Sequence, residues 1–117
     1  MRFCIVFSYH SLNIKIGKLP DDTQLYFCHE YTENNLRFAQ TLEPKNEDIQ
    51  SQLIKIRRVR SEGKCSTPSL LSSERKINPF LRCNDQALQK HVSQKHPDTN
   101  LDPVSIFTAI RKLKDQF

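Results

Sequence analysis

The sequence predicts an α+β chain in which one short strand is accompanied mainly by helices. The apolar run Leu25-Tyr26-Phe27-Cys28 predicts a strand over residues 24–29. Apolar residues recur at helical spacing in two later segments, one with Ile49, Leu53 and Ile56 and one with Ile106, Ile110, Leu113 and Phe117. These three observations together define the fold class.

The elements before and after the strand are less sharply defined. Residues 11–18 place three apolar side chains among polar ones, which fits either a strand or a helix. Residues 19–23 should break that element, because proline restricts the residue before it and aspartates favour turns. After the strand, Thr32 is expected to cap a helix, in which Glu33 suits the positive end of the helix dipole. That helix should end at Glu43-Pro44.

A second helix is expected from Asn46 to Gly63, a residue that suits a helix terminus. Residues 64–73 contain serines and a proline and predict a loop. Residues 74–82 contain Asn-Pro-Phe, which predicts an extended or turn segment that inserts an aromatic ring into the core. The middle of the chain is therefore expected to hold one helix followed by irregular structure.

Two more helices are expected near the C-terminus. Residues 85–94 have the composition of a short helix. Asp102 can cap a last helix that begins at Pro103, where a missing amide proton costs nothing. On that helix Arg111 and Lys114 are three positions apart, so both cations can point the same way.

Composition limits the partners of the chain. Hydrophobic residues make up 37% of the 117 residues and charged residues 26%, and no apolar run approaches the roughly 20 residues of a membrane helix. The net charge of +5 favours anionic partners. The central cations lack interleaved aromatic rings and have acidic neighbours, so we expect a solvated helix face and no nucleic acid there; these cations are Lys55, Arg57, Arg58, Arg60 and Lys64.

The four cysteines are Cys4, Cys28, Cys65 and Cys83, and no two are close in sequence. Scattered cysteines of this kind are expected to be reduced thiols, because disulfides are rare in reducing compartments. This spacing predicts a protein of the cytoplasm or the mitochondrial matrix.

Several blocks of the sequence resemble one known family in order and spacing. The main block is His29-Glu30-Tyr31-Thr32, followed by Asn34-Asn35-Leu36-Arg37-Phe38-Ala39, and others are Asn78-Pro79-Phe80-Leu81-Arg82, Asp102-Pro103-Val104 and Arg111-Lys112-Leu113-Lys114-Asp115-Gln116-Phe117. Together they resemble the C-terminal portion of glyoxalase II, the hydroxyacylglutathione hydrolase family, over about residues 11–117.

The resemblance implies a fold and a set of boundaries. Residues 1–10 lie outside it and are expected to form a separate N-terminal segment. Residues 11–45, in which it favours a helix over 11–18, would be the end of a metallo-β-lactamase αββα sandwich. Residues 46–117 would form the small helical C-terminal domain of the family. The chain is then expected to be a C-terminal fragment or truncated isoform.

The resemblance also implies a metal ligand. His29 matches a histidine that holds one ion of a binuclear centre, usually zinc, with iron also accommodated. The remaining ligands should come from a His-x-His-x-Asp-His segment and further residues earlier in the chain, and the sequence has no such segment. A single histidine cannot hold a divalent ion tightly, so we expect no firmly bound metal.

Three residues are implied to contact the substrate. Tyr31 matches a tyrosine that contacts glutathione, and Arg111 and Lys114 match a pair that grips a glutathione carboxylate. The sequence departs from the family at Cys28, where glycine is usual, and the added side chain could crowd the backbone beside the metal position.

The resemblance implies hydrolysis of S-2-hydroxyacylglutathione thiolesters, such as S-D-lactoylglutathione, to glutathione and a hydroxy acid. We expect this chain to be inactive alone, because most metal ligands are missing. Two alternatives stay open, namely a small basic module that binds nucleic acid or another polyanion, and an incomplete gene model. Steep salt dependence of binding would favour the first alternative.

Overall fold

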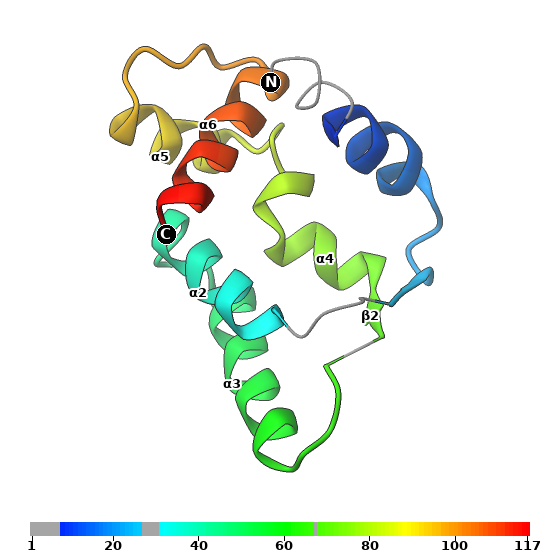
Figure 1. Ribbon diagram of the computed structural model, residues 1–117. Coiled ribbons are helices and arrows are strands. Elements are labelled where there is room, and N and C mark those ends of the chain that lie inside the picture. The colour runs from blue at the N-terminus through cyan, green and yellow to red at the C-terminus, as the bar shows by residue number, and fades with distance from the viewer. Residues whose placement is uncertain (1–7, 27–30, 67) are drawn as a thin grey trace. The chain divides into compact units, whose positions relative to one another are not determined.

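The computed structural model describes residues 8–26, 31–66 and 68–117, and the chain forms two compact units. One unit is Pro20–Asn78, and the other combines Met1–Leu19 with Pro79–Phe117. The described residues are mainly helical with one two-stranded sheet, which confirms the α+β class (Figure 1).

Two helices, α2 (Thr32–Leu42) and α3 (Glu47–Ser61), dominate the unit formed by residues 20–78. Figure 1 shows them side by side and running in opposite directions. Their apolar faces, together with one residue of a later helix, form a buried core of Leu36, Ala39, Ile49, Leu53, Ile56 and Ile77. The stripe expected on the second helix is confirmed.

Local sequence signals explain both ends of α3 but not the start of α2. Asn46 caps α3, because its Oδ1 accepts hydrogen bonds from the backbone N–H groups of Asp48 and Ile49. After α3, Gly63 takes a φ of 74°, a left-handed conformation that favours glycine. The cap expected at Thr32 is wrong, because α2 begins with that residue and its Oγ1 instead lies 2.7 Å from Ser66 Oγ.

The sheet consists of β1 (Gln24–Leu25) and β2 (Ser69–Leu70), paired antiparallel with Gln24 opposite Leu70. The described strand stops before Tyr26, and residues 27–29 of the expected strand lie outside the described residues. The pairing continues in two backbone hydrogen bonds, from Leu71 N–H to the Thr23 carbonyl at 2.9 Å and from Ser72 N–H to the Asp21 carbonyl at 3.1 Å.

A helix, α4 (Leu71–Ile77), follows β2 where a loop and an extended segment were expected. That expectation is wrong for residues 69–77. Leu71 and Ile77 are both buried, so apolar burial at the two ends of α4 stabilises a helix that its serines do not predict. The turn expected at Asn-Pro-Phe is found at η3 (Pro79–Leu81), a 3₁₀ turn in the other unit.

The other unit begins with a helical stretch, η1 (His10–Lys15) and η2 (Ile16–Lys18), which confirms a helix over residues 11–18. A Cβ atom at Gly17 would lie 2.8 Å from the carbonyl oxygen of Leu12, so this close backbone approach requires glycine. Asn13 joins the stretch to η3 by donating from Nδ2 to the Phe80 carbonyl at 3.0 Å.

The same unit ends with α5 (Gln86–Lys95) and α6 (Pro103–Gln116), both close to their expected positions. Side chains cap both helices: Asp85 accepts from Leu88 N–H and Asp102 accepts from Ser105 N–H. Phe107 of α6 lies in the core, where the rings of Phe80 and Tyr9 meet it edge to face at centroid distances of 5.1 and 5.7 Å. The prediction that Asn-Pro-Phe packs an aromatic ring is thereby confirmed.

The apolar stripe of α6 is confirmed in part. Ile106 and Ile110 are fully buried, but Phe117 is 51% exposed, so its assignment to the buried stripe is wrong. Phe117 follows the last helical residue, where the helical rotation no longer carries its ring to the buried side. In the part of the chain that the structure describes, no helix has both the length and the apolar character needed to cross a bilayer.

Candidate functional site

The last turns of α6 carry the two cations that the sequence singled out. Arg111 donates from Nη2 to Asp115, four residues later on the same helix. Lys114 places its Nζ 5.6 Å from the centroid of the Phe117 ring, a cation–π contact. The structure thus places both cations one turn apart on one helix and gives each a neighbour that restricts its side chain.

Arg111 retains capacity for a ligand. A guanidinium has five N–H donors, and the contact with Asp115 engages Nη2. Its side chain is 51% exposed. A carboxylate can therefore approach the remaining donors of Arg111, with Lys114 adding a second positive charge in the next turn.

Tyr31 lies at the N-terminal boundary of α2 and is 62% exposed. Its carbonyl accepts a hydrogen bond from the Asn35 N–H at 2.9 Å, which joins its backbone to the first turn of the helix. Tyr31 belongs to the unit of residues 20–78, whereas Arg111 and Lys114 belong to the other unit.

The proposed metal ligand, His29, lies outside the described residues, as does Cys28 beside it. Within residues 8–26, 31–66 and 68–117, no three histidine, cysteine, aspartate or glutamate side chains cluster in a way that could hold a metal ion. These residues therefore do not fit a divalent metal centre, and no chemical step is assigned through one.

The basic surface of α3 carries several ion pairs. Arg57 pairs with Glu33 at 2.9 Å, and Glu62 pairs with Arg58 at 3.5 Å and with Lys64 at 2.8 Å. All of these side chains are substantially exposed, so each pair contributes about 0–1 kcal/mol. This arrangement favours the interpretation of a solvated helix face.

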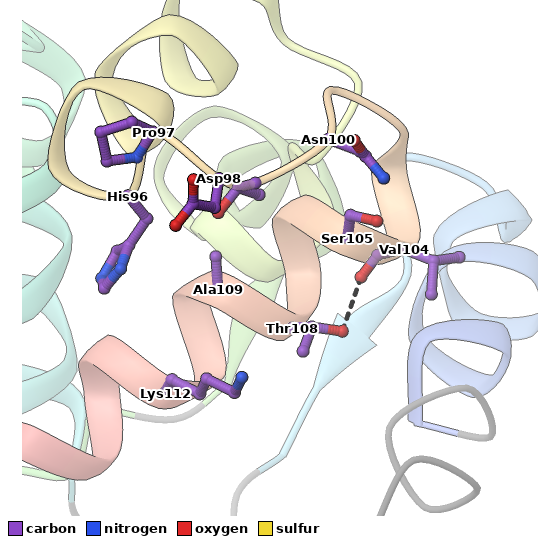
Figure 2. Close-up of a pocket in the computed structure, with 10 residues that line it drawn as sticks. His96, Pro97, Asp98, Asn100, Val104, Ser105, Thr108, Ala109 and Lys112 are labelled. Atoms are coloured by element: carbon purple, nitrogen blue, oxygen red, sulfur yellow. Dashed lines mark hydrogen bonds between the residues drawn. The ribbon is translucent and has the colours of Figure 1, made fainter.

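A separate hollow of about 430 Å³ lies between the loop that follows α5 and one face of α6 (Figure 2). The loop contributes residues 96–100, among them His96 and Asp98, and the helix contributes Ser105, Thr108 and Lys112 with two apolar neighbours. Sequence reasoning missed this group, because it singled out apolar stripes and motif residues. The available signal was the turn composition Pro97-Asp98-Thr99-Asn100 opposite a polar helix face.

Comparisons with known proteins decide the family. A family model described as the C-terminus of hydroxyacylglutathione hydrolase matches residues 30–117. The chain belongs to the hydroxyacylglutathione hydrolase family. This match confirms the resemblance to the C-terminal portion of glyoxalase II that the sequence blocks indicated.

Curated hydroxyacylglutathione hydrolases are similar to most of this chain. The protein of Rhizobium etli is 44% identical over 109 residues, which cover 93% of this chain and 41% of the relative. Those of Pseudomonas savastanoi pv. phaseolicola and Aliivibrio salmonicida are each 41% identical, covering 88% and 93% of this chain and 40% and 42% of the relatives. The chain spans about two fifths of the length of the hydroxyacylglutathione hydrolases it matches.

Proposed function

We propose that this chain supplies the C-terminal, glutathione-contacting part of an enzyme that hydrolyses S-2-hydroxyacylglutathione thiolesters, such as S-D-lactoylglutathione, to glutathione and a 2-hydroxy acid. The observation that carries the proposal is the family match over residues 30–117, a segment that includes Tyr31, Arg111 and Lys114. No comparison supports the alternative of a nucleic-acid-binding module.

The three residues have chemistry suited to a tripeptide with free carboxylates. The Arg111 fork and the Lys114 ammonium bind one carboxylate of glutathione through charge-assisted hydrogen bonds. The phenol of Tyr31 donates to a carbonyl or carboxylate while its ring packs on the peptide. Their exposed positions support this role for Arg111 and Tyr31.

His29 is the metal ligand in this proposal, one of a set that would hold two zinc ions, with iron also accommodated. Such ions, where the full ligand set holds them, would supply Lewis-acid chemistry for thiolester hydrolysis. The 117-residue sequence has no His-x-His-x-Asp-His segment to complete the set. The chain by itself therefore holds no metal tightly and hydrolyses no thiolester.

The finer assignment of the fold is part of the same proposal. Residues 11–45 are the end of a metallo-β-lactamase-like domain, residues 46–117 are the helical C-terminal domain, and residues 1–10 lie outside the family. The free thiols Cys65 and Cys83 support a reducing compartment, the cytoplasm or the mitochondrial matrix.

Titration of the chain with glutathione, followed by amide shifts in NMR, tests the assignment of the two cations. We expect millimolar binding, which corresponds to about 4 kcal/mol, with shifts around residues 111–117. The double variant Arg111→Ala/Lys114→Ala should lose these shifts, because two charge-assisted contacts account for most of so small a free energy. His29→Ala should leave them unchanged, because no metal links that residue to the ligand.

A double variant that removes two exposed lysines elsewhere, Lys45→Ala/Lys90→Ala, matches the loss of charge and should bind as the parent chain does. Equal weakening in both double variants would reduce the interaction to net charge and refute the proposed contacts. A larger loss with His29→Ala than with the α6 variant would mean that a metal organises the site, and the non-catalytic proposal would fail.

A further inference from the structure

We propose that the hollow between the α5–α6 loop and α6 binds a zwitterionic amino acid or short peptide, with the ligand's ammonium group on Asp98 and its carboxylate on Lys112. This site differs from the proposed glutathione contacts, which use Arg111 and Lys114 on another part of the helix surface. The two proposals stand or fall separately.

The argument begins with two uncompensated charges on one hollow. Asp98 and Lys112 both line it, and neither has an ion-pair or hydrogen-bond partner within the described chain. No ion pair joins them to each other, although their charges are opposite. In Figure 2, Asp98 comes from the loop and Lys112 from the helix, on either side of Ala109 in this view. Such a separation suits a ligand that carries one charge of each sign.

The neighbouring cation on α6 differs from Lys112 in having a carboxylate partner. Arg111, the preceding residue on α6, has Asp115 as its carboxylate partner. The position four residues after Lys112 is Gln116, which carries no charge. Asp115, three residues after Lys112, is already paired with Arg111, so a carboxylate of the ligand can serve as the partner of Lys112.

The hydroxyl groups that line the hollow favour a ligand that carries hydrogen-bond donors. Ser105 donates from Oγ to Asp102 Oδ1 at 2.6 Å, and Thr108 donates from Oγ1 to the Val104 carbonyl at 2.8 Å. Each hydroxyl has therefore used its hydrogen within α6 and retains lone pairs that accept. Ammonium and amide N–H groups of a peptide match these acceptors.

The size of the hollow sets the length of the ligand. Its volume of about 430 Å³ falls within the range of small-ligand sites, roughly 300–1,000 Å³. Ala109 and Val104 add small apolar contacts beneath the polar groups. A di- or tripeptide fills this space better than a single inorganic ion. A simple anion is repelled by Asp98 and a simple cation is repelled by Lys112, so both kinds of ion are disfavoured.

The test is an NMR titration of the chain with triglycine and with two derivatives that each lack one charge, N-acetyltriglycine and triglycine amide. We expect saturable shifts for triglycine in the amides of residues 96–100 and 104–112. Each derivative should bind about tenfold or more weakly, because it loses one charge-assisted contact. Equal shifts from all three compounds, or the absence of saturation, would overturn the proposal.

Variants test the two named side chains. Asp98→Asn and Lys112→Gln should each weaken triglycine binding about tenfold, and both residues are exposed, so the fold should be retained. Lys90→Gln removes an exposed lysine of α5 that does not line the hollow and should bind as the parent chain does. Unchanged affinity in the Asp98 and Lys112 variants would assign the binding elsewhere and refute the proposed site.

Discussion

The two cysteines that the structure describes, Cys83 and Cys65, differ in burial. Cys83 is 1% exposed, and burial raises the pKa of its thiol to about 12, while its Sγ donates to the Pro79 carbonyl at 3.6 Å. Cys65 is an exposed free thiol in the loop after α3. Because the thiolate is the reactive form, the two positions should differ strongly in reactivity.

A timed pulse of iodoacetamide at pH 8 should therefore alkylate Cys65 at least about a hundredfold faster than Cys83, because Cys83 is both protonated and covered. Mass spectrometry of the digested protein measures each site. In denaturant the two rates should converge, which serves as the control. Comparable rates in the native chain would show that Cys83 is not buried as described.

Asp85 makes the stability of the α5 cap depend on pH. The pKa of its carboxyl is lowered chiefly by the hydrogen bond from Leu88 N–H, with a further contribution from the Arg82 cation 3.1 Å away. A lowered folded-state pKa means that the stabilisation is complete above the unfolded-state pKa of about 3.9 and is lost as the pH falls through the folded-state value.

Replacing Asp85 by alanine should cost about 1 kcal/mol of unfolding free energy at pH 7, because α5 loses its cap. The difference between parent and variant should shrink below about pH 4, where the parent carboxyl also becomes neutral. Urea unfolding at a series of pH values measures this. A difference that grew on acidification would contradict the assigned sign.

At the scale of elements, local signals predicted helices and long-range contacts decided the rest. Asn46, Asp85 and Asp102 cap helices in the structure, and of these Asp102 is the cap that the sequence predicted. A cap depends on residues within one turn, so its signal is local. Helix α4 could not be identified from sequence, because its first N–H groups donate to the carbonyls of Thr23 and Asp21, far away in sequence. A serine-rich segment therefore forms a helix that its own composition does not favour.

The helical hairpin of α2 and α3 allows a matched comparison at adjacent residues. Leu53 is 4% exposed and belongs to the core, whereas Ile54 is 70% exposed. Leu53→Ala should lower the free energy of unfolding by about 2–5 kcal/mol through lost burial and a cavity. Ile54→Ala, which changes the same helix, should stay within about 0.5 kcal/mol. Similar losses in thermal or urea unfolding would mean that α3 buries a different face.

At the scale of the whole molecule, the family could be recognised from sequence, but the candidate site only in part. Arg111 and Lys114 follow from a motif and a helical period, and the structure places both on α6. The hollow around Asp98 and Lys112 joins a loop to the polar side of that helix. The turn composition and the polar helix face do not indicate which charged residues meet, so only the folded chain brings these two charges to one place.

The ligand set of the whole chain leads to the last prediction, which concerns metal content. His10, His91 and His96 form no three-residue group with other ligand types in the described ranges, and His29 has no His-x-His-x-Asp-His segment to join it. Tight binding of a divalent ion requires several preorganised ligands. After dialysis, elemental analysis should find substantially less than one zinc or iron per chain, and His29→Ala should not change that value. Two firmly held ions per chain, lost on His29→Ala, would show that the chain assembles a complete metal centre and would remove the reason for expecting it to be inactive.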